Sequence, residues 1–244
     1  MLTLAAASLC LVLQAPPTMD ELRKNMAEDM RKLTSYSDEW KVELPKEAEG
    51  GDLAFKRYID GPRSQLSVIF DGKPMLESGF DGKNSWVISH AVKVYADEAA
   101  PNAVFEKKTE FGAPKDAEDG SFQFTFSGPY DFSIWAKPDL QTIKIEKVKL
   151  GDIETRKVTA IATKPTGKME VEMWFDLDRW RMVKARAHGG KTGEPETEVA
   201  MVLIKSSFTE KYDSSSFAIE QAKIGGYTKK TFEDLKGGGL RSGV

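Results

Sequence analysis

From residue 40 onward, apolar and polar positions alternate with a period of two. The first such segment, residues 40–44, places Trp40, Val42 and Leu44 between charged residues. Because successive side chains of a β-strand point to opposite faces, this alternation predicts strands with one buried face. Turn signals such as Asp60-Gly61-Pro62 and Asp81-Gly82 separate the segments and predict one antiparallel meander. The predicted strands are 40–44, 53–59, 65–70, 75–80, 85–90, 92–95, 121–127, 132–136, 142–150, 156–163, 168–175, 181–187 and 196–206.

Two segments of the chain lack this alternation. Residues 18–33 begin with a capping box, Thr18-Met19-Asp20-Glu21, and continue with apolar residues at steps of three and four. That spacing predicts an amphipathic helix, which residues 35–38 are expected to end. Residues 97–119 follow neither period, contain two prolines, and are predicted to form a long loop with one short helix. We expect the helix, with its adaptable Met26 and Met30, and this loop to act as movable covers.

Large apolar residues are numerous on the predicted sheet. Taken one at a time, each is explained by a place in an ordinary core. A sheet of about eleven strands, however, has more apolar surface than one helix and two short segments can cover. The sheet therefore either closes on itself or leaves part of this face for a ligand. The residues expected to line such a hydrophobic cavity are Trp40, Phe70, Trp86, Phe122, Phe124, Phe126, Phe132, Met173 and Phe175.

The two ends of the chain differ from this body. Residues 1–15 carry no charge, and their apolar run is shorter than the roughly 20 residues that span a bilayer. This pattern favours a secretory signal cleaved after Ala15, although no basic residue precedes the run. Alternatives are a membrane-anchored lipoprotein attached through Cys10, and a cytosolic chain with an apolar start. Residues 16–220 are predicted to form one domain, and residues 221–244, rich in Gly and Lys, a loosely held tail.

Composition and motifs exclude several functions. The chain has 35 basic and 38 acidic residues spread along its length, which argues against nucleic acid as a partner. No phosphate-binding, dinucleotide-binding or nucleophile motif is present, and no spacing of ligands suits a metal. His90 and His188 lie far apart in sequence and are predicted to be exposed residues at strand ends, rather than a pair. We therefore expect a monomer that is not an enzyme and needs no cofactor.

Several short motifs resemble the periplasmic lipoprotein-carrier family of the LolA and LolB type, including its uncharacterised periplasmic relatives. The resemblance spans roughly residues 18–220 of this chain. The motifs are Leu33-Thr34-Ser35-Tyr36-Ser37, Ala54-Phe55-Lys56-Arg57, Phe80-Asp81-Gly82-Lys83-Asn84-Ser85-Trp86 followed by Val94-Tyr95, Glu172-Met173-Trp174-Phe175-Asp176 followed by Met182-Val183, and Ser216-Phe217.

This resemblance implies a mainly β fold with few helices: one curved antiparallel sheet, an incomplete barrel of about 11 strands, covered by helices. It implies a periplasmic carrier that binds lipid or lipoprotein acyl chains on the concave apolar face and is free to contact a membrane peripherally. Arg57 occupies the stretch comparable to an arginine that latches the lid in carriers, although Tyr58-Ile59-Asp60 follows where the carriers have an Arg-Pro pair. The alternative is an envelope sensor of the same fold that binds a protein partner.

Overall fold

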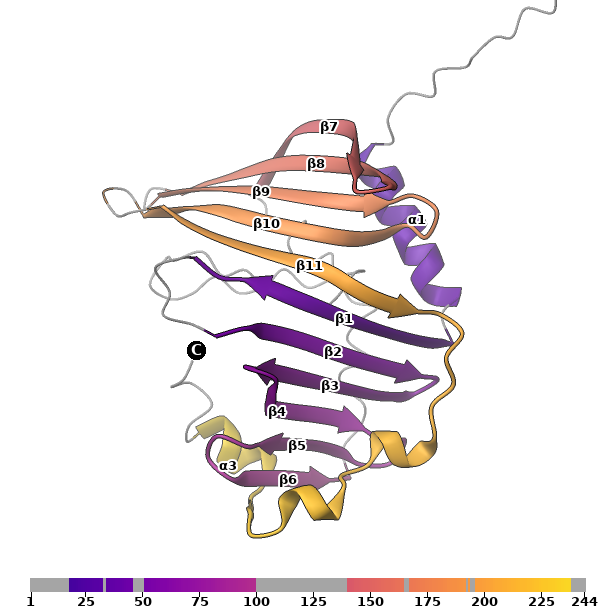
Figure 1. The fold of residues 1–244 in the computed structure, drawn as a ribbon, viewed down its shortest axis with the longest axis vertical. Helices are drawn as coiled ribbons and strands as arrows, with labels where there is room; N and C mark the ends of the chain where they lie inside the picture. The colour runs from indigo at the N-terminus through magenta and orange to yellow at the C-terminus, as the bar shows by residue number, and fades with distance from the viewer. Residues whose placement is uncertain are drawn as a thin grey trace, which may run out of the picture.

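The computed structural model describes residues 18–32, 34–45, 51–99, 140–164, 167–191, 193 and 196–237. In this part of the chain most residues lie in strands, and the strands form one large curved sheet that is not closed into a barrel (Figure 1). The mainly β class and the incomplete barrel expected from the sequence are therefore confirmed. The predicted signal segment, the strands 121–127 and 132–136, and the loop beyond residue 99 lie outside the described residues.

The sheet consists of two antiparallel meanders and a short added strand. Its strand order is β12-β6-β5-β4-β3-β2-β1-β11-β10-β9-β8-β7. The first meander contains β1 (Ser35–Glu43), β2 (Leu53–Asp60), β3 (Arg63–Phe70), β4 (Lys73–Phe80), β5 (Ser85–Ser89) and β6 (Val94–Glu98). The second contains β7 (Leu140–Leu150), β8 (Ile153–Lys164), β9 (Gly167–Asp176), β10 (Arg181–Lys191) and β11 (Thr197–Ser207).

The two meanders meet in the middle of the sheet, where β1 pairs antiparallel with β11. After β11 the chain forms two 3-10 turns, η3 (Ser214–Phe217) and η4 (Gln221–Ile224), before β12 (Thr228–Lys229) and the helix α3 (Phe232–Gly237). β12 pairs parallel with β6, so it lies at the end of the sheet opposite β7. The predicted tail thus contains η4, β12 and α3 in its described part, and its loose attachment stays a prediction.

The N-terminal helix α1 (Met19–Lys32) begins at the predicted capping box. The backbone N–H of Thr18 donates to Glu21 at 2.8 Å, and the N–H of Glu21 donates to the Thr18 hydroxyl at 3.3 Å. These two bonds satisfy amides that have no partner within the helix. The predicted helix end at residues 35–38 is wrong, because β1 already starts at Ser35. Tyr36 and Asp38 continue the alternation of Trp40 and belong to the strand.

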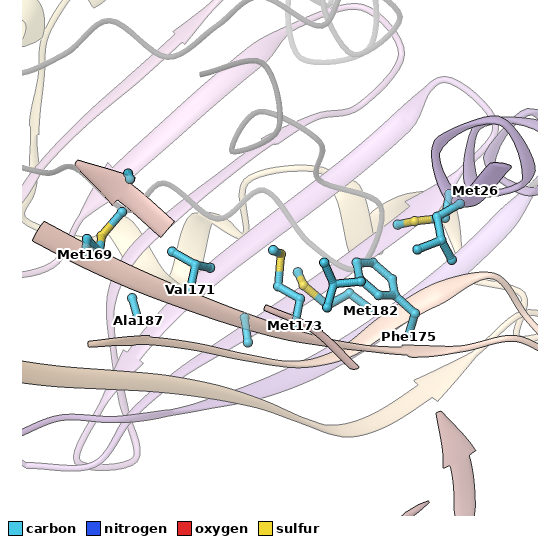
Figure 2. Packing of buried hydrophobic residues seen from close by; sticks show 11 residues of the cluster. Met26, Met169, Val171, Met173, Phe175, Met182 and Ala187 are labelled. Carbon is cyan, nitrogen blue, oxygen red and sulfur yellow. The ribbon is translucent and has the colours of Figure 1, made fainter. Parts of the chain in front are cut away.

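The largest buried cluster lies between α1 and the second meander. Leu22 and Met26 of α1 are buried against side chains of β8, β9 and β10. Figure 2 shows Met173, Phe175 and Met182 on the sheet with Met26 approaching from the helix. Four of the buried side chains in this cluster are methionines, which fill irregular space well. They are Met26, Met169, Met173 and Met182.

Truncation of Phe175 tests how much this cluster contributes to the free energy of unfolding. Phe175 is 1% exposed, so Phe175→Ala leaves a cavity and should lower the free energy of unfolding by about 3–5 kcal/mol. Ile204 is 59% exposed, and Ile204→Ala should change it by less than about 1 kcal/mol. Urea denaturation followed by tryptophan fluorescence measures both. Equal effects of the two substitutions would contradict the assignment of this core.

Candidate ligand-binding face

Cross-strand pairs arrange one continuous apolar row across eight strands. Residues that pair directly across antiparallel strands point to the same face, so the register identifies the members of the row. Leu22 and Met26 of α1 share one buried cluster with three of them, Val158, Met173 and Ala185, and Ile145 packs against this cluster. We call the face that carries this row the inner face. From β7 to β3 the row is Ile145, Val158, Met173, Ala185, Met201, Val42, Leu53 and Phe70.

A second apolar row lies beside it over the first meander. Trp40 and Val42 are two residues apart on β1, so both point to the inner face. From β11 to β4 the second row is Leu203, Trp40, Phe55, Val68 and Leu76. Trp40, Val42 and Met201 are buried at the centre, and Leu53, Phe55, Val199 and Leu203 pack against them.

Burial along the inner face falls from the second meander toward the first. Val158, Val171 and Met173, near α1, are 0–1% exposed. Phe55, Val68, Phe70 and Leu76 are half-buried, and Leu66 of β3 is 37% exposed. The apolar surface over β2, β3 and β4 is therefore covered less completely than the surface beneath the helix.

A charged pair is embedded in this apolar surface. Arg57 of β2 lies opposite Asp38 of β1, and its guanidinium donates to the carboxylate at 2.6 Å. The Tyr36 hydroxyl donates to the same oxygen of Asp38 at 2.8 Å, and the guanidinium lies 5.4 Å from the centre of the Tyr36 ring. The side chains of Arg57 and Asp38 are 12% and 2% exposed.

Burial and pairing act in opposite directions on Arg57. Burial lowers the pKa of the guanidinium, but the carboxylate of Asp38 and the hydroxyl of Tyr36 raise it, so that the pKa lies above its ordinary value. Arg57 is therefore charged at neutral pH. A buried charge requires such a partner, because the loss of hydration is otherwise uncompensated. The pair fixes β1 to β2 next to the apolar rows.

The structure brings several of the predicted site residues together. Trp40, Phe70, Met173 and Phe175 all lie on the inner face, as do Arg57 and Met26. Trp86 does not join them: it pairs with Gly79 and points to the opposite, outer face. The side chain of Met30 lies outside the described residues, as do the four predicted phenylalanines of the middle segment, Phe122, Phe124, Phe126 and Phe132.

Two partners of Arg57 were missed by sequence reasoning. Asp38 and Tyr36 fall in the segment assigned to the helix end, so their side chains were not considered. Extending the alternation of Trp40 and Val42 back by four residues would have placed both on the same face as Trp40. The opposite charges of Asp38 and Arg57 on adjacent strands are the signal that could have paired them.

The histidines form two separate contacts. His90 Nε2 lies 2.9 Å from Glu77, and His188 Nε2 lies 2.9 Å from Glu196. Five strands lie between β5, which His90 follows, and β10, which carries His188, so the two residues do not form a pair. Among the described residues, no group of three or more His, Cys, Asp or Glu side chains could hold a metal ion. None of the described helices is both long enough and apolar enough to cross a membrane.

Comparison with known proteins finds similarity of fold only. No protein-family model matches the chain, and no curated protein matches it. Among solved structures, it is similar to an uncharacterized conserved protein from Thermus thermophilus at 8% identity and a TM-score of 0.47, over 87% of this chain and 98% of the other. It is also similar to the lipoprotein LppX of Mycobacterium tuberculosis at 10% identity and a TM-score of 0.41, over 80% and 100%.

A third similar structure is the MucA/MucB complex of Pseudomonas aeruginosa, at 13% identity and a TM-score of 0.44, over 83% of this chain and 60% of the other. At these identities and TM-scores, the similarity extends to no ligand or partner.

Removal of the Asp38 carboxylate tests the embedded pair. Asp38→Ala should lower the free energy of unfolding by about 3–5 kcal/mol, because the buried Arg57 guanidinium loses its carboxylate. Glu39→Ala is the matched control on the same strand: Glu39 pairs with Lys56 at 3.3 Å, both side chains are more than a third exposed, and the loss should stay below about 1 kcal/mol. Urea denaturation at neutral pH compares them. A loss in Asp38→Ala no larger than the loss in Glu39→Ala would contradict the assignment of a buried pair that depends on its carboxylate.

Proposed function

We propose that the protein is an envelope carrier that binds the acyl chain of a lipid or lipoprotein on its inner face. The observation that carries this proposal is the apolar row across eight strands, whose members on β2 and β3, Leu53 and Phe70, are only half-buried. A surface of this extent suits an extended apolar guest better than a small polar metabolite. Export to the periplasm through residues 1–15 is part of the same proposal.

Burial of an acyl chain on this face is favourable in free energy without any polar contact. Burial of one methylene group contributes about 0.8 kcal/mol, so a chain of about fourteen carbons gains roughly 11 kcal/mol on leaving water. A bilayer offers nearly the same gain, so a carrier must release its guest as readily as it takes it up. A face that is firmly covered at one end and less covered at the other meets both requirements.

The roles of Arg57, Met26 and Met30 in this proposal concern the cover of the face. Met26 contributes an adaptable contact between α1 and the sheet. Arg57 is itself buried, but it lies directly opposite the exposed Leu66, at the border of the less covered part of the inner face, which is a suitable place for an arginine that latches a cover. An envelope protein partner that inserts an apolar segment would use the same face as a lipid and would compete with it.

Charge placed on the least covered part of the inner face should weaken the binding of an apolar ligand. Leu66→Glu should weaken binding of a dansyl-labelled fatty acid by at least about tenfold, because the guest would then contact a carboxylate in place of an apolar side chain. Ile204→Glu serves as the control, since Ile204 is also exposed but lies at the irregularity in the pairing of β1 with β11 and not over β2, β3 or β4. Fluorescence titration gives the Kd of each variant.

The outcome separates the two functional classes. Failure of the unmodified protein to bind the labelled fatty acid, together with absence of lipid in its native mass spectrum after gentle extraction, would overturn the carrier proposal. A stable stoichiometric protein partner recovered from envelope extracts, lost in Leu66→Glu and kept in Ile204→Glu, would favour the sensor in its place.

A further inference from the structure

The outer face of the first meander is crossed by the segment that follows β11. This segment, residues 210–229, leaves the centre of the sheet and reaches its far edge at β6 (Figure 1). We call it the strap. At its start, Ser37 of β1 donates a hydrogen bond to the Glu210 carboxylate at 3.2 Å. At its end, β12 pairs with β6 through two residues, Thr228 and Lys229.

Contacts hold the strap along its whole course. The Tyr212 ring meets the Tyr58 ring of β2 edge-on at 4.9 Å, and burial raises the pKa of Tyr212 to about 12. The Arg63 guanidinium lies 5.0 Å from the centre of the Phe217 ring, which is fully buried. The Trp86 indole of β5 donates to the Phe217 carbonyl at 2.6 Å. The strap is therefore held to the sheet mainly through side chains rather than a long ladder.

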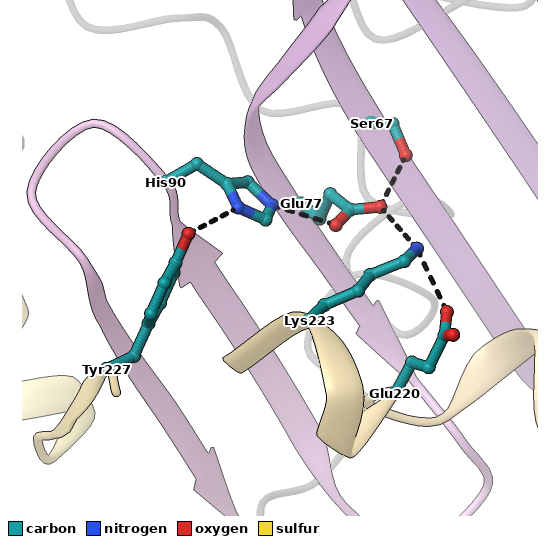
Figure 3. Close-up of polar contacts among 6 residues, drawn as sticks. All are labelled: Ser67, Glu77, His90, Glu220, Lys223 and Tyr227. Atoms are coloured by element: carbon teal, nitrogen blue, oxygen red, sulfur yellow. Dashed lines mark hydrogen bonds and ion pairs between the residues drawn. The ribbon is translucent and has the colours of Figure 1, made fainter. Parts of the chain in front are cut away.

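Glu77 of β4 is the charged anchor of this attachment. Its carboxylate is buried, and three groups surround it (Figure 3). Lys223 of the strap lies 3.5 Å away and His90 lies 2.9 Å away, while the Ser67 hydroxyl donates at 3.4 Å. His90 in turn lies 3.0 Å from the Tyr227 hydroxyl of the strap. Two of the three partners of Glu77 thus belong to the strap or are bonded to it.

The same strands carry the inner face. Ser67, Glu77 and Trp86 point outward, and their neighbours in sequence, Val68, Leu76 and Val87, point to the inner face, because side chains alternate along a strand. A change in the curvature of β1 to β6 must therefore move the anchors of the strap relative to one another. The attached strap restrains the shape of the half of the inner face that is least covered.

We propose that the strap is a releasable restraint that sets how fast the inner face exchanges its ligand, with Glu77 as the lock. This inference rests on the proposed carrier function. The strap is suited to release because only two residue pairs join β12 to β6 and because Lys223 is 43% exposed at its contact with Glu77. Release would leave the buried carboxylate without its ammonium partner, which favours reattachment.

Neutralising Glu77 tests the lock. In the ligand-free protein, Glu77→Gln should speed hydrogen exchange of the Thr228 and Lys230 amides, which donate to the Lys93 and Tyr95 carbonyls, by about tenfold or more. Exchange in β8 and β9 should stay unchanged. Glu198→Gln is the matched control, because Glu198 of β11 also pairs with a cation, Arg186, away from the strap. Exchange is followed by mass spectrometry of the full chain.

Ligand exchange is then measured on the same variants. Dissociation of the dansyl-labelled fatty acid should be about fivefold faster from Glu77→Gln than from Glu198→Gln, which should match the unmodified protein. Trp86→Phe, which removes the bond to the Phe217 carbonyl and keeps an aromatic ring, provides a second route to the same result if Glu77→Gln does not fold.

The two measurements separate the possible failures. Unchanged hydrogen exchange of the strap amides in both Glu77→Gln and Trp86→Phe would overturn the role of Glu77 as a lock. Faster hydrogen exchange of the strap amides with unchanged dissociation of the fatty acid would overturn the coupling of the strap to the inner face, and would leave the carrier proposal intact. Absence of binding by the unmodified protein would overturn the carrier function and the coupling together, whatever the exchange rates of the strap.

Discussion

The strand register of the sheet is the constraint on which the rest of the structure depends. Because side chains alternate between faces, a slip of one residue in any pair would move a strand's apolar residues to the opposite side. The register holds one apolar row together from Ile145 on β7 to Phe70 on β3. Four pairings contain a local irregularity, yet none interrupts this row. The continuity of the inner face thus depends on correct pairing of all the strands that carry the row.

The outer face satisfies different requirements. Over the second meander it carries ion pairs: Arg186 lies between Glu172 and Glu198, and Lys157 pairs with Glu172. Burial raises the pKa of Glu172, but these two cations lower it below its ordinary value, so the carboxylate stays charged. Over the first meander the strap covers part of this face and buries Trp86 and Ile88 of β5. The outer face is thus partly exposed to solvent and partly covered by the strap. On the inner face, α1 covers the second meander.

The period of the sequence predicted the fold well where one face of a strand is buried. The helix at residues 18–33, the turn at Gly61 and the hairpin turn at Gly82 were all visible in local patterns. Local patterns cannot report which face a strand turns toward a given neighbour, so Trp86 was grouped with Trp40 although the two point to opposite faces. The sheet register, set by pairs distant in sequence, separates them.

Interactions between segments that are distant in sequence could not be predicted from local patterns either. Glu77, His90 and Lys223 carry no common motif, and only the return of the chain across the outer face brings them into contact. Tyr36 and Asp38 were within reach of the alternation but were hidden by an expected helix end. Residues of the candidate site that belong to a repeating pattern could be predicted, whereas those that depend on long-range pairing could not.

The pairing of β1 with β11 imposes an order on folding. Each meander is built from hairpins between neighbouring strands, which form quickly because their ends are close in sequence. The central pair, which joins Ser37 to Ser207, needs a strand near each end of the domain. Until β11 has been synthesised, β1 exposes an unpaired edge, which is a place where chains aggregate. A protein of this topology therefore depends on keeping its first strand protected until the last long strand arrives.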